Sequence, residues 1–230
     1  MKTKAFKAAF PHTIPVLMGY LFLGMAFGIL LSSNGYHFGW AMVMSIFIYA
    51  GSMQFVAVGL VTSGFSVIGT VLITLMVNAR HLFYGLSMLT KFNDMGKKKP
   101  YMIFSLTDET FSLLCSVEVP KEVDKNWFYL FIALLNQSYW ITGSAIGGVI
   151  GSLFTFNTKG IDFVMTALFI VIFLNQWESN PNHRPALIGI CAAIICLLIF
   201  GPQNFIIPAM ITILLVLTPL NKPIAERELK

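Results

Sequence analysis

The sequence predicts an all-α polytopic membrane protein with about seven to eight transmembrane helices, some of them short or broken. Hydrophobic residues make up 57% of the 230 positions and charged residues only 11%, whereas charged residues make up about 25% of an ordinary soluble domain. The charges are also segregated, because long segments contain no Asp, Glu, Lys or Arg: 8–79, 126–158, 163–177 and 185–221. About 20 mostly apolar residues span a hydrocarbon core, so these segments hold several spans.

The N-terminal segment indicates the location and orientation of the chain. Lys2, Lys4 and Lys7 precede an apolar run over residues 14–31. This run is longer than the apolar part of a signal peptide, which favours a retained first span. The net charge of +5 lies at the termini and in the loops, where it indicates topology and contact with anionic lipid, not nucleic-acid binding. We expect a multi-pass membrane protein with a cytoplasmic N-terminus.

One transmembrane domain over residues 1–230 is expected, with Gly-, Asn- and Ser-rich breaks between its spans. The expected spans are 14–32, 40–60, 65–89, 101–116, 127–152, 162–177, 184–200 and 203–218. Those at 101–116, 162–177 and 203–218 are short for a full crossing. Short or interrupted spans are typical of transporters in which half-helices surround a binding site.

Two parts of the chain resemble each other and predict an internal two-fold repeat. GWAMVMSIFIYAGSMQ at 39–54 resembles GIDFVMTALFIVIFLNQ at 160–176, and Gly24 and Gly28 are matched by Gly143 and Gly147. The expected units are 14–90 and 127–218, joined by the polar and charged region 91–126. Chance likeness between apolar helices is the alternative, because they share a small alphabet.

The distribution of lysines conflicts with a simple topology. With a cytoplasmic N-terminus and eight crossings, the lysines at 97–99 would lie outside, against the positive-inside rule. The cluster would move inside if 65–89 did not cross fully. The sequence therefore predicts that region 65–116 is irregular.

Arg80 and His81 form a charged and titratable pair inside the otherwise uncharged run 65–89. A charge at such depth costs at least about 2.5–3.5 kcal/mol and is expected to face a protein interior or a wet cavity. On a helix, Asn78 shares a face with His81, and Tyr84 shares one with Arg80. We expect these four residues to line a substrate or proton pathway; a purely structural ion pair of Arg80 is the alternative.

Asp108 and Glu109 are equally unusual in the apolar segment 101–116. One acid is expected to compensate the charge of Arg80 while the other titrates in a proton relay with His81, whose ordinary pKa of about 6.5 suits that role. A surface-lying amphipathic segment with both acids in water is the alternative.

A third polar group lies in the YAGSMQF stretch at 49–55. Gly51 and Ser52 permit a backbone break or a close helix approach, and Gln54 places an amide at depth. Asn175 and Gln176 occupy the corresponding place in the second repeat unit. These residues predict a polar cavity, although interhelical hydrogen bonds would explain any one of them.

The sequence offers no metal-binding or catalytic signature. The histidines lack metal-ligand spacing, the three cysteines form no C-x-x-C, and neither H-E-x-x-H nor a protease constellation is present. We therefore expect no cofactor, no metal and no enzyme. The class that competes with a carrier is a passive channel for small polar or zwitterionic solutes, since charged rings and amide-lined constrictions serve channels too.

The motifs resemble a known family: FIYAGSMQFVAVGL at 47–60, TLMVNARHLFYGLSM at 74–88, SLTDETF at 105–111 and DFVMTALFIVIFLNQW at 162–177. Together they are similar to the AzlC-like large subunit of the azaleucine-resistance, branched-chain amino-acid exporter family. The resemblance implies export of branched-chain or related apolar amino acids, in exchange for protons. It also implies a small hydrophobic AzlD-like partner subunit with about four spans. In that setting Arg80 would meet the substrate carboxylate, and Asp108 or Glu109 its ammonium.

Overall fold

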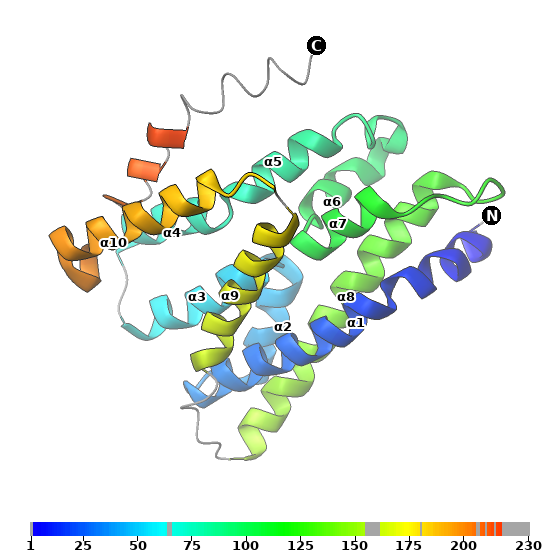
Figure 1. Ribbon diagram of the computed structural model, residues 1–230. Coiled ribbons are helices and arrows are strands. Elements are labelled where there is room, and N and C mark those ends of the chain that lie inside the picture. Colours follow the sequence, from blue (N-terminus) through cyan, green and yellow to red (C-terminus); the bar gives the residue numbers. More distant parts are fainter. Residues whose placement is uncertain are drawn as a thin grey trace, which may run out of the picture. The chain divides into compact units, whose positions relative to one another are not determined.

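The computed structural model of the chain describes residues 2–63, 66–154, 162–179, 181–205, 208–209, 211–213 and 215–217. Every regular element in these ranges is helical, as expected (Figure 1). The elements are α1 (Lys2–Ser33), α2 (Phe38–Phe47), α3 (Gly51–Ser63), α4 (Val67–Val77), α5 (Ala79–Met88), the 3-10 helix η1 (Asn93–Lys98), α6 (Lys99–Phe104), α7 (Asp108–Ser116), α8 (Lys125–Leu153), α9 (Asp162–Ser179) and α10 (Arg184–Asn204).

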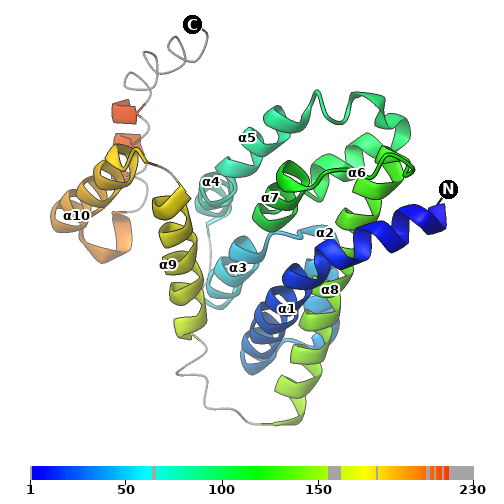
Figure 2. The same ribbon diagram turned by 45° about the vertical axis from the view of Figure 1, so that its right-hand side comes forward.

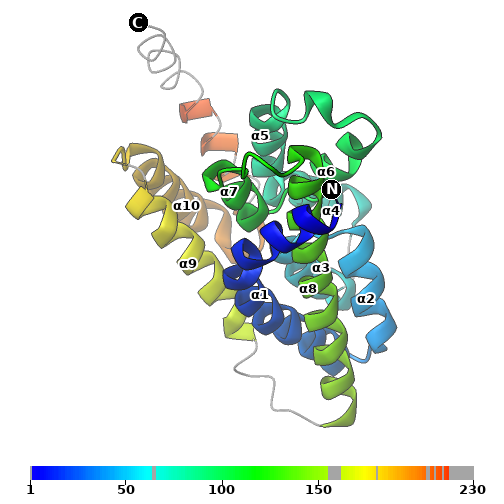
Figure 3. The same cartoon turned by 90° about the vertical axis from the view of Figure 1, so that its right-hand side faces the viewer.

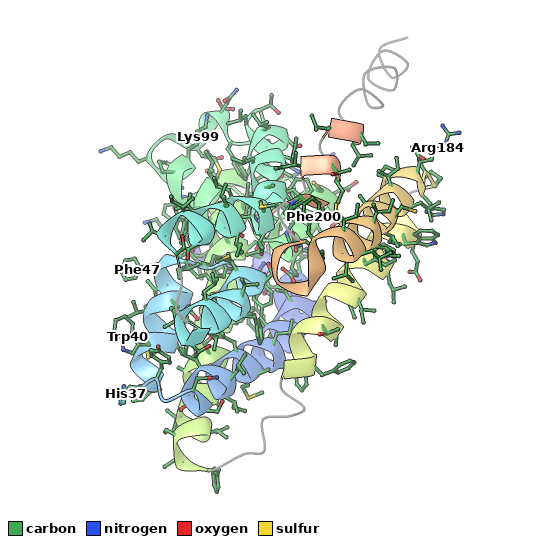
Figure 4. The ribbon with its side chains drawn as sticks, turned by 90° about the vertical axis from the view of Figure 1, so that its left-hand side faces the viewer. His37, Trp40, Phe47, Lys99, Arg184 and Phe200 are labelled. Carbon is green, nitrogen blue, oxygen red and sulfur yellow. The ribbon has the colours of Figure 1, made fainter. Side chains whose placement is uncertain are left out.

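The chain forms two compact units, 1–70 with 77–166 and 71–76 with 167–230. In the second unit, Arg184 and Phe200 lie near the two ends of α10 (Figure 4), which kinks at Gly201 with φ of 73°. The rest of the description concerns the first unit, because it contains the expected site.

Helices α1 and α8 form the centre of the first unit and run side by side in the same direction (Figure 1). Leu21 lies against Gly143, and further along the pair Met25 lies against Gly147. A Cβ added at Gly147 would come 2.1 Å from the Met25 carbonyl oxygen, and one at Gly28 would come 2.2 Å from that of Ser144. Lipid tails are as apolar as side chains, so this close packing, and not removal from water, stabilises the pair.

The glycine pairs that suggest a repeat therefore meet each other in the structure. Because α1 and α8 run in the same direction, a repeat of these two helices would be of the parallel kind, not the inverted kind. The two-fold repeat itself stays a prediction.

Helix α8 also organises the neighbours of α1. Helix α2 is antiparallel to α8. Phe38, at the start of α2, contacts Gly148, whereas Ser45, later in α2, bonds Ser144 nearer the middle of α8. Helices α6 and α7 lie next to each other along the other half of α8 (Figure 2). Helix α6 is parallel to α8 and α7 is antiparallel to it. Leu114 of α7 therefore packs in the same core as residues 128–133. The α6–α7 segment is therefore a helical hairpin.

Between residues 38 and 116, each of the three expected spans is broken into two helical parts. The expected span 40–60 divides into α2 and α3 at Ile48–Ala50, where Tyr49 adopts a φ of 44°. This conformation is unusual for a non-glycine residue and costs on the order of 1–3 kcal/mol. Span 65–89 divides at Asn78, with a bend of 45° between α4 and α5. Span 101–116 divides at 105–107, and the Thr107 side chain caps α7 by accepting a bond from the Thr110 N–H.

The number of spans stays a prediction. Within the described residues, α1 and the first 18 residues of α10 are long and apolar enough to cross a membrane, and the bent pair α4–α5 makes a third if it is one span. Helix α8 has 29 residues and is thus ~43 Å long. Its buried residues include the polar Asn136, Gln137 and Ser144, so protein, not lipid, covers the face on which they lie.

The structure removes the conflict over the lysine cluster. Lys98 lies over the Trp127 ring at 3.5 Å and Lys2 lies over the same ring at 4.4 Å. Figure 3 shows the N-terminus at the same end of the α1–α8 pair as the first turns of α8, which contain Trp127. Residues 97–99 and the N-terminus therefore lie on the same side of the membrane, because one indole cannot face both sides. The predicted irregularity of 65–116 is confirmed by its two breaks.

Candidate functional site

The breaks bring the N-terminal turns of α3, α5 and α7 together around one guanidinium group. Nη2 of Arg80, in the first turn of α5, lies 3.1 Å from Oδ2 of Asp108, in the first turn of α7. The same Nη2 donates to Oγ of Ser52, in the first turn of α3, at 2.9 Å. The Arg80 and Asp108 side chains remain 23% and 26% exposed. A ligand can therefore reach them.

Aromatic and imidazole groups hold Asp108 from its other side. The Tyr84 hydroxyl donates to Oδ1 of Asp108 at 2.8 Å, and the Tyr84 ring stacks on Phe111 with centroids 4.3 Å apart. The His81 ring lies edge-on to Tyr84 at 5.7 Å, and its Nδ1 is 3.3 Å from the Asn78 carbonyl oxygen. The expected grouping of Arg80, His81, Tyr84 and Asp108 is therefore present in the structure.

The helix dipoles act in opposite directions on the two charges. A carboxylate in the first turn of α7 is favoured by about 0.3–1 kcal/mol, whereas a cation in the first turn of α5 is disfavoured by a similar amount. Arg80 therefore depends on Asp108 and Ser52 for its stability at that position. Its Nε is buried and has no hydrogen-bond partner among the described residues. The guanidinium thus keeps a free donor for another anionic group.

Glu109 has different neighbours, although it follows Asp108 directly. The Tyr20 hydroxyl donates to Oε2 of Glu109 at 2.7 Å and lies 2.5 Å from Oγ1 of Thr107. Adjacent helical residues point about 100° apart, so the two acids diverge. The role of Tyr20 was missed in the sequence because α1 carries no charge near it.

Gln54 and Gly51 contact Trp140 of α8. Nε1 of Trp140 donates to Oε1 of Gln54 at 2.8 Å, and Nε2 of Gln54 donates to Oγ of Ser45 at 3.2 Å. Gln54 is fully buried with both amide atoms bonded, which is the arrangement of an interhelical tie. A Cβ at Gly51 would approach the Trp140 ring to 3.0 Å, so Gly51 permits close packing at the break.

Consecutive amides on α8 connect the two broken segments. Nε2 of Gln137 donates to the Ile46 carbonyl near the end of α2, while the Tyr101 hydroxyl of α6 donates to Oε1 of Gln137. The neighbouring Asn136 donates to Oγ1 of Thr110 in α7 at 3.0 Å. Both breaks are therefore anchored at the same level of α8.

Three expected site residues remain: Asn175, Gln176 and Asn78. Asn175 and Gln176 belong to α9, but their side chains lie outside the described part of the structure. Oδ1 of Asn78 is buried and makes no hydrogen bond with a described residue. It lies at the bend between α4 and α5, where it leaves a polar acceptor beside His81.

Comparisons with known proteins identify the family. The family model described as AzlC protein matches residues 15–154, which include every expected site residue except Asn175 and Gln176. The chain is 52% identical over 224 residues to "Branched-chain amino acid transport protein AzlC" of Bacillus subtilis (strain 168), covering 97% of this chain and 88% of that protein. The chain belongs to the AzlC family.

More distant relatives carry names that place them in membranes. An "Uncharacterized membrane protein" of Helicobacter pylori (strain J99 / ATCC 700824) is 47% identical over 95% of this chain and 96% of its own length. "Inner membrane protein YgaZ" of Escherichia coli (strain K12) is 27% identical over 79% of this chain and 78% of its own length. No solved structure matches the chain. Family and composition together establish a helical membrane protein of a transport family.

Proposed function

We propose that the chain is a secondary transporter that exports branched-chain and related apolar amino acids across the bacterial cytoplasmic membrane. It acts in exchange for protons, as the large subunit of a two-component exporter. The name of the Bacillus subtilis relative supports the substrate class. The observation that carries the proposal is the Arg80–Asp108 pair at the meeting point of three helix N-termini, inside a chain of a membrane transport family.

The substrate carboxylate binds at Arg80. Helix N-termini favour anions because their backbone N–H groups are unsatisfied and their dipoles are positive at that end. The first turns of α3, α5 and α7 supply this environment, and Nε of Arg80 supplies a free donor. A carboxylate that approaches Arg80 competes with Asp108 for the guanidinium, so substrate binding loosens the contact between α5 and α7.

Proton exchange is assigned to the acids of α7. The carboxylate of Asp108 is neutralised by Arg80, whereas Glu109 has no cationic partner among the described residues and accepts a hydroxyl bond from Tyr20. A carboxylate without a counter-charge at depth gains most from binding a proton. This arrangement supports one compensating acid and one titrating acid, and His81, whose ring lies against Tyr84 on the Asp108 side, is the candidate relay.

The small partner subunit covers part of the first unit. Helix α2 exposes Trp40 at 58% and Phe47 at 74%, and both project from its outer side in Figure 4. Gly143 and Gly147 are already occupied by α1, so they are not the contact with the partner. The exposed face of α2 is the better candidate, because its large apolar side chains suit lipid or another transmembrane helix.

Reconstituted vesicles test the transport mechanism. Vesicles containing the chain and its partner are loaded with labelled leucine, and a pH gradient is then imposed. Saturable counterflow that follows the gradient is expected of the carrier. Flux that rises linearly with leucine and ignores the gradient would instead identify a passive channel.

A further inference from the structure

A series of side-chain oxygen atoms in contact begins at Glu109 and continues on the side away from the Arg80 guanidinium. Glu109 is bonded by Tyr20, Tyr20 contacts Thr107, and Oγ1 of Thr107 donates to Oγ1 of Thr110 at 3.0 Å. Thr110 in turn accepts from Asn136 on α8. Thr110 and Asn136 are fully buried, and Tyr20 is 4% exposed. This series of side chains therefore links α1, α7 and α8 through groups that can all accept a hydrogen bond.

Two polar atoms of this region lack partners. Oδ1 of Asn136 is buried and unbonded among the described residues, and so is the hydroxyl of Tyr49. An unsatisfied buried polar group costs about 1–3 kcal/mol. Turning the Asn136 amide over would place its oxygen against Thr110 but leave its nitrogen unbonded. In either orientation one polar atom of Asn136 remains free.

Tyr49 is held at this place by its unusual backbone. It is 3% exposed, its φ of 44° lies in the break between α2 and α3, and its ring faces Phe104 at 6.2 Å. Its hydroxyl lies near those of Thr110 and Tyr20 but makes no hydrogen bond to a described residue. Backbone strain of this kind persists only where the surrounding structure maintains it. The unusual backbone at Tyr49 thus places its hydroxyl, which belongs to the α2–α3 segment, beside the α6–α7 segment.

The chemistry of the cluster selects a small cation. Its groups are one carboxylate, an amide and several hydroxyls, and none of them carries a positive charge. The described residues contain no group of three or more His, Cys, Asp and Glu side chains that could hold a metal ion, which disfavours a transition metal or a divalent ion. A monovalent cation needs only one negative charge and neutral oxygen ligands, which the cluster supplies.

We propose that Glu109, Tyr20, Thr107, Thr110, Asn136 and Tyr49 form a binding site for a monovalent cation, either a sodium ion or the ammonium group of an amino acid. The ammonium source rests on the proposed function, whereas the sodium source does not. A cation at this site and a proton on Glu109 exclude each other, since both need the same carboxylate. Such exclusion is the requirement for exchange of one against the other.

Thermal unfolding of the purified full chain tests the site. Sodium chloride is titrated against choline chloride at equal ionic strength, and 3-methylbutylamine is titrated against 4-methylpentanoate. A saturable rise of the unfolding temperature with sodium identifies the ion as ligand. A rise with the amine but not with sodium identifies the ammonium group. If neither probe changes the unfolding temperature of the unmodified chain, the site does not exist.

Variants localise the effect. Tyr49→Phe and Glu109→Gln are expected to weaken the apparent affinity of the active probe by about tenfold or more, because each removes a bond to a charged ligand. Tyr139→Phe is the matched control, because its hydroxyl bonds Thr13 at 3.0 Å outside the cluster. Unchanged affinity in Tyr49→Phe and Glu109→Gln would overturn the assignment. Leucine export by the same variants, reconstituted in vesicles together with the small partner subunit, separates the two proposals, since an active exporter without any cation effect keeps the function and loses this site.

Discussion

Arg80 and Asp108 lie 3.1 Å apart, Nη2 to Oδ2, although the 3-10 helix η1 and helix α6 separate their two helices along the chain. Each is in the first turn of its helix, so the ion pair joins two helix N-termini that would otherwise repel each other. Ser52 adds a third N-terminus through its bond to the same nitrogen. Under the proposed mechanism, a substrate that competes for Arg80 would therefore act on three helices at once.

Replacing Arg80 by lysine tests the guanidinium. Arg80→Lys keeps the charge and is expected to leave the protein in the membrane, because Asp108 is still compensated. It should reduce leucine export about tenfold or more, because an ammonium lacks the planar fork that binds two carboxylates. Arg184→Lys, at an exposed position of α10, is the control. Near-normal export by Arg80→Lys would leave only a general role for the charge.

The acids of α7 predict a separation of coupling from exchange. Glu109→Gln removes the acid to which proton exchange is assigned but keeps a side chain that can bond Tyr20. We expect exchange of leucine for leucine to continue, while uphill export driven by a pH gradient stops. Asp94→Asn, at an exposed position of η1, should export normally. Gradient-driven export that survives both Asp108→Asn and Glu109→Gln would move the coupling role to His81.

The contact between α1 and α8 predicts a strong difference between two glycines of one helix. A Cβ at Gly28 meets Ser144 O at 2.2 Å, whereas a Cβ at Gly19 meets nothing within 4 Å. Gly28→Ala is expected to destabilise the protein by about 1–3 kcal/mol or more through overpacking. Gly19→Ala should be neutral or stabilising by about 0.5–1 kcal/mol. Unfolding in detergent gives both values, and equal stability of the two variants would contradict the packing.

The partner subunit is tested by co-expression. The chain is produced with and without an AzlD-like small membrane protein, and the mass of the extracted complex is compared with leucine export. We expect a stable complex and export only when both are present. Trp40→Ala with Phe47→Ala on the exposed face of α2 should weaken the complex, whereas Leu198→Ala on α10, which is also exposed, should not. Full export by the chain alone would refute the two-component arrangement.

Much of the site could be predicted from the sequence because polar groups are conspicuous in an apolar chain. Arg80, Asp108 and Glu109 attract attention for what they would cost in lipid, and that cost belongs to the residue type. Tyr20 and Tyr49 carry no such signal, because a tyrosine in an apolar helix is as often packing as function. Gln54 shows the converse, since its deep amide is satisfied by Trp140 and Ser45.

The sequence by itself determined that this protein lies in a membrane, that it is helical, and which residues cannot face lipid. All three conclusions follow from transfer free energies summed along the chain. Only the tertiary structure decided which acid pairs with Arg80, because Asp108 and Glu109 point about 100° apart and the choice depends on where α5 and α1 lie. It also decided that the lysines near α6 share an end with the N-terminus. Breaks at 48–50, at Asn78 and at 105–107 redirect the chain, and the direction after a break depends on packing against α8, which no local pattern records.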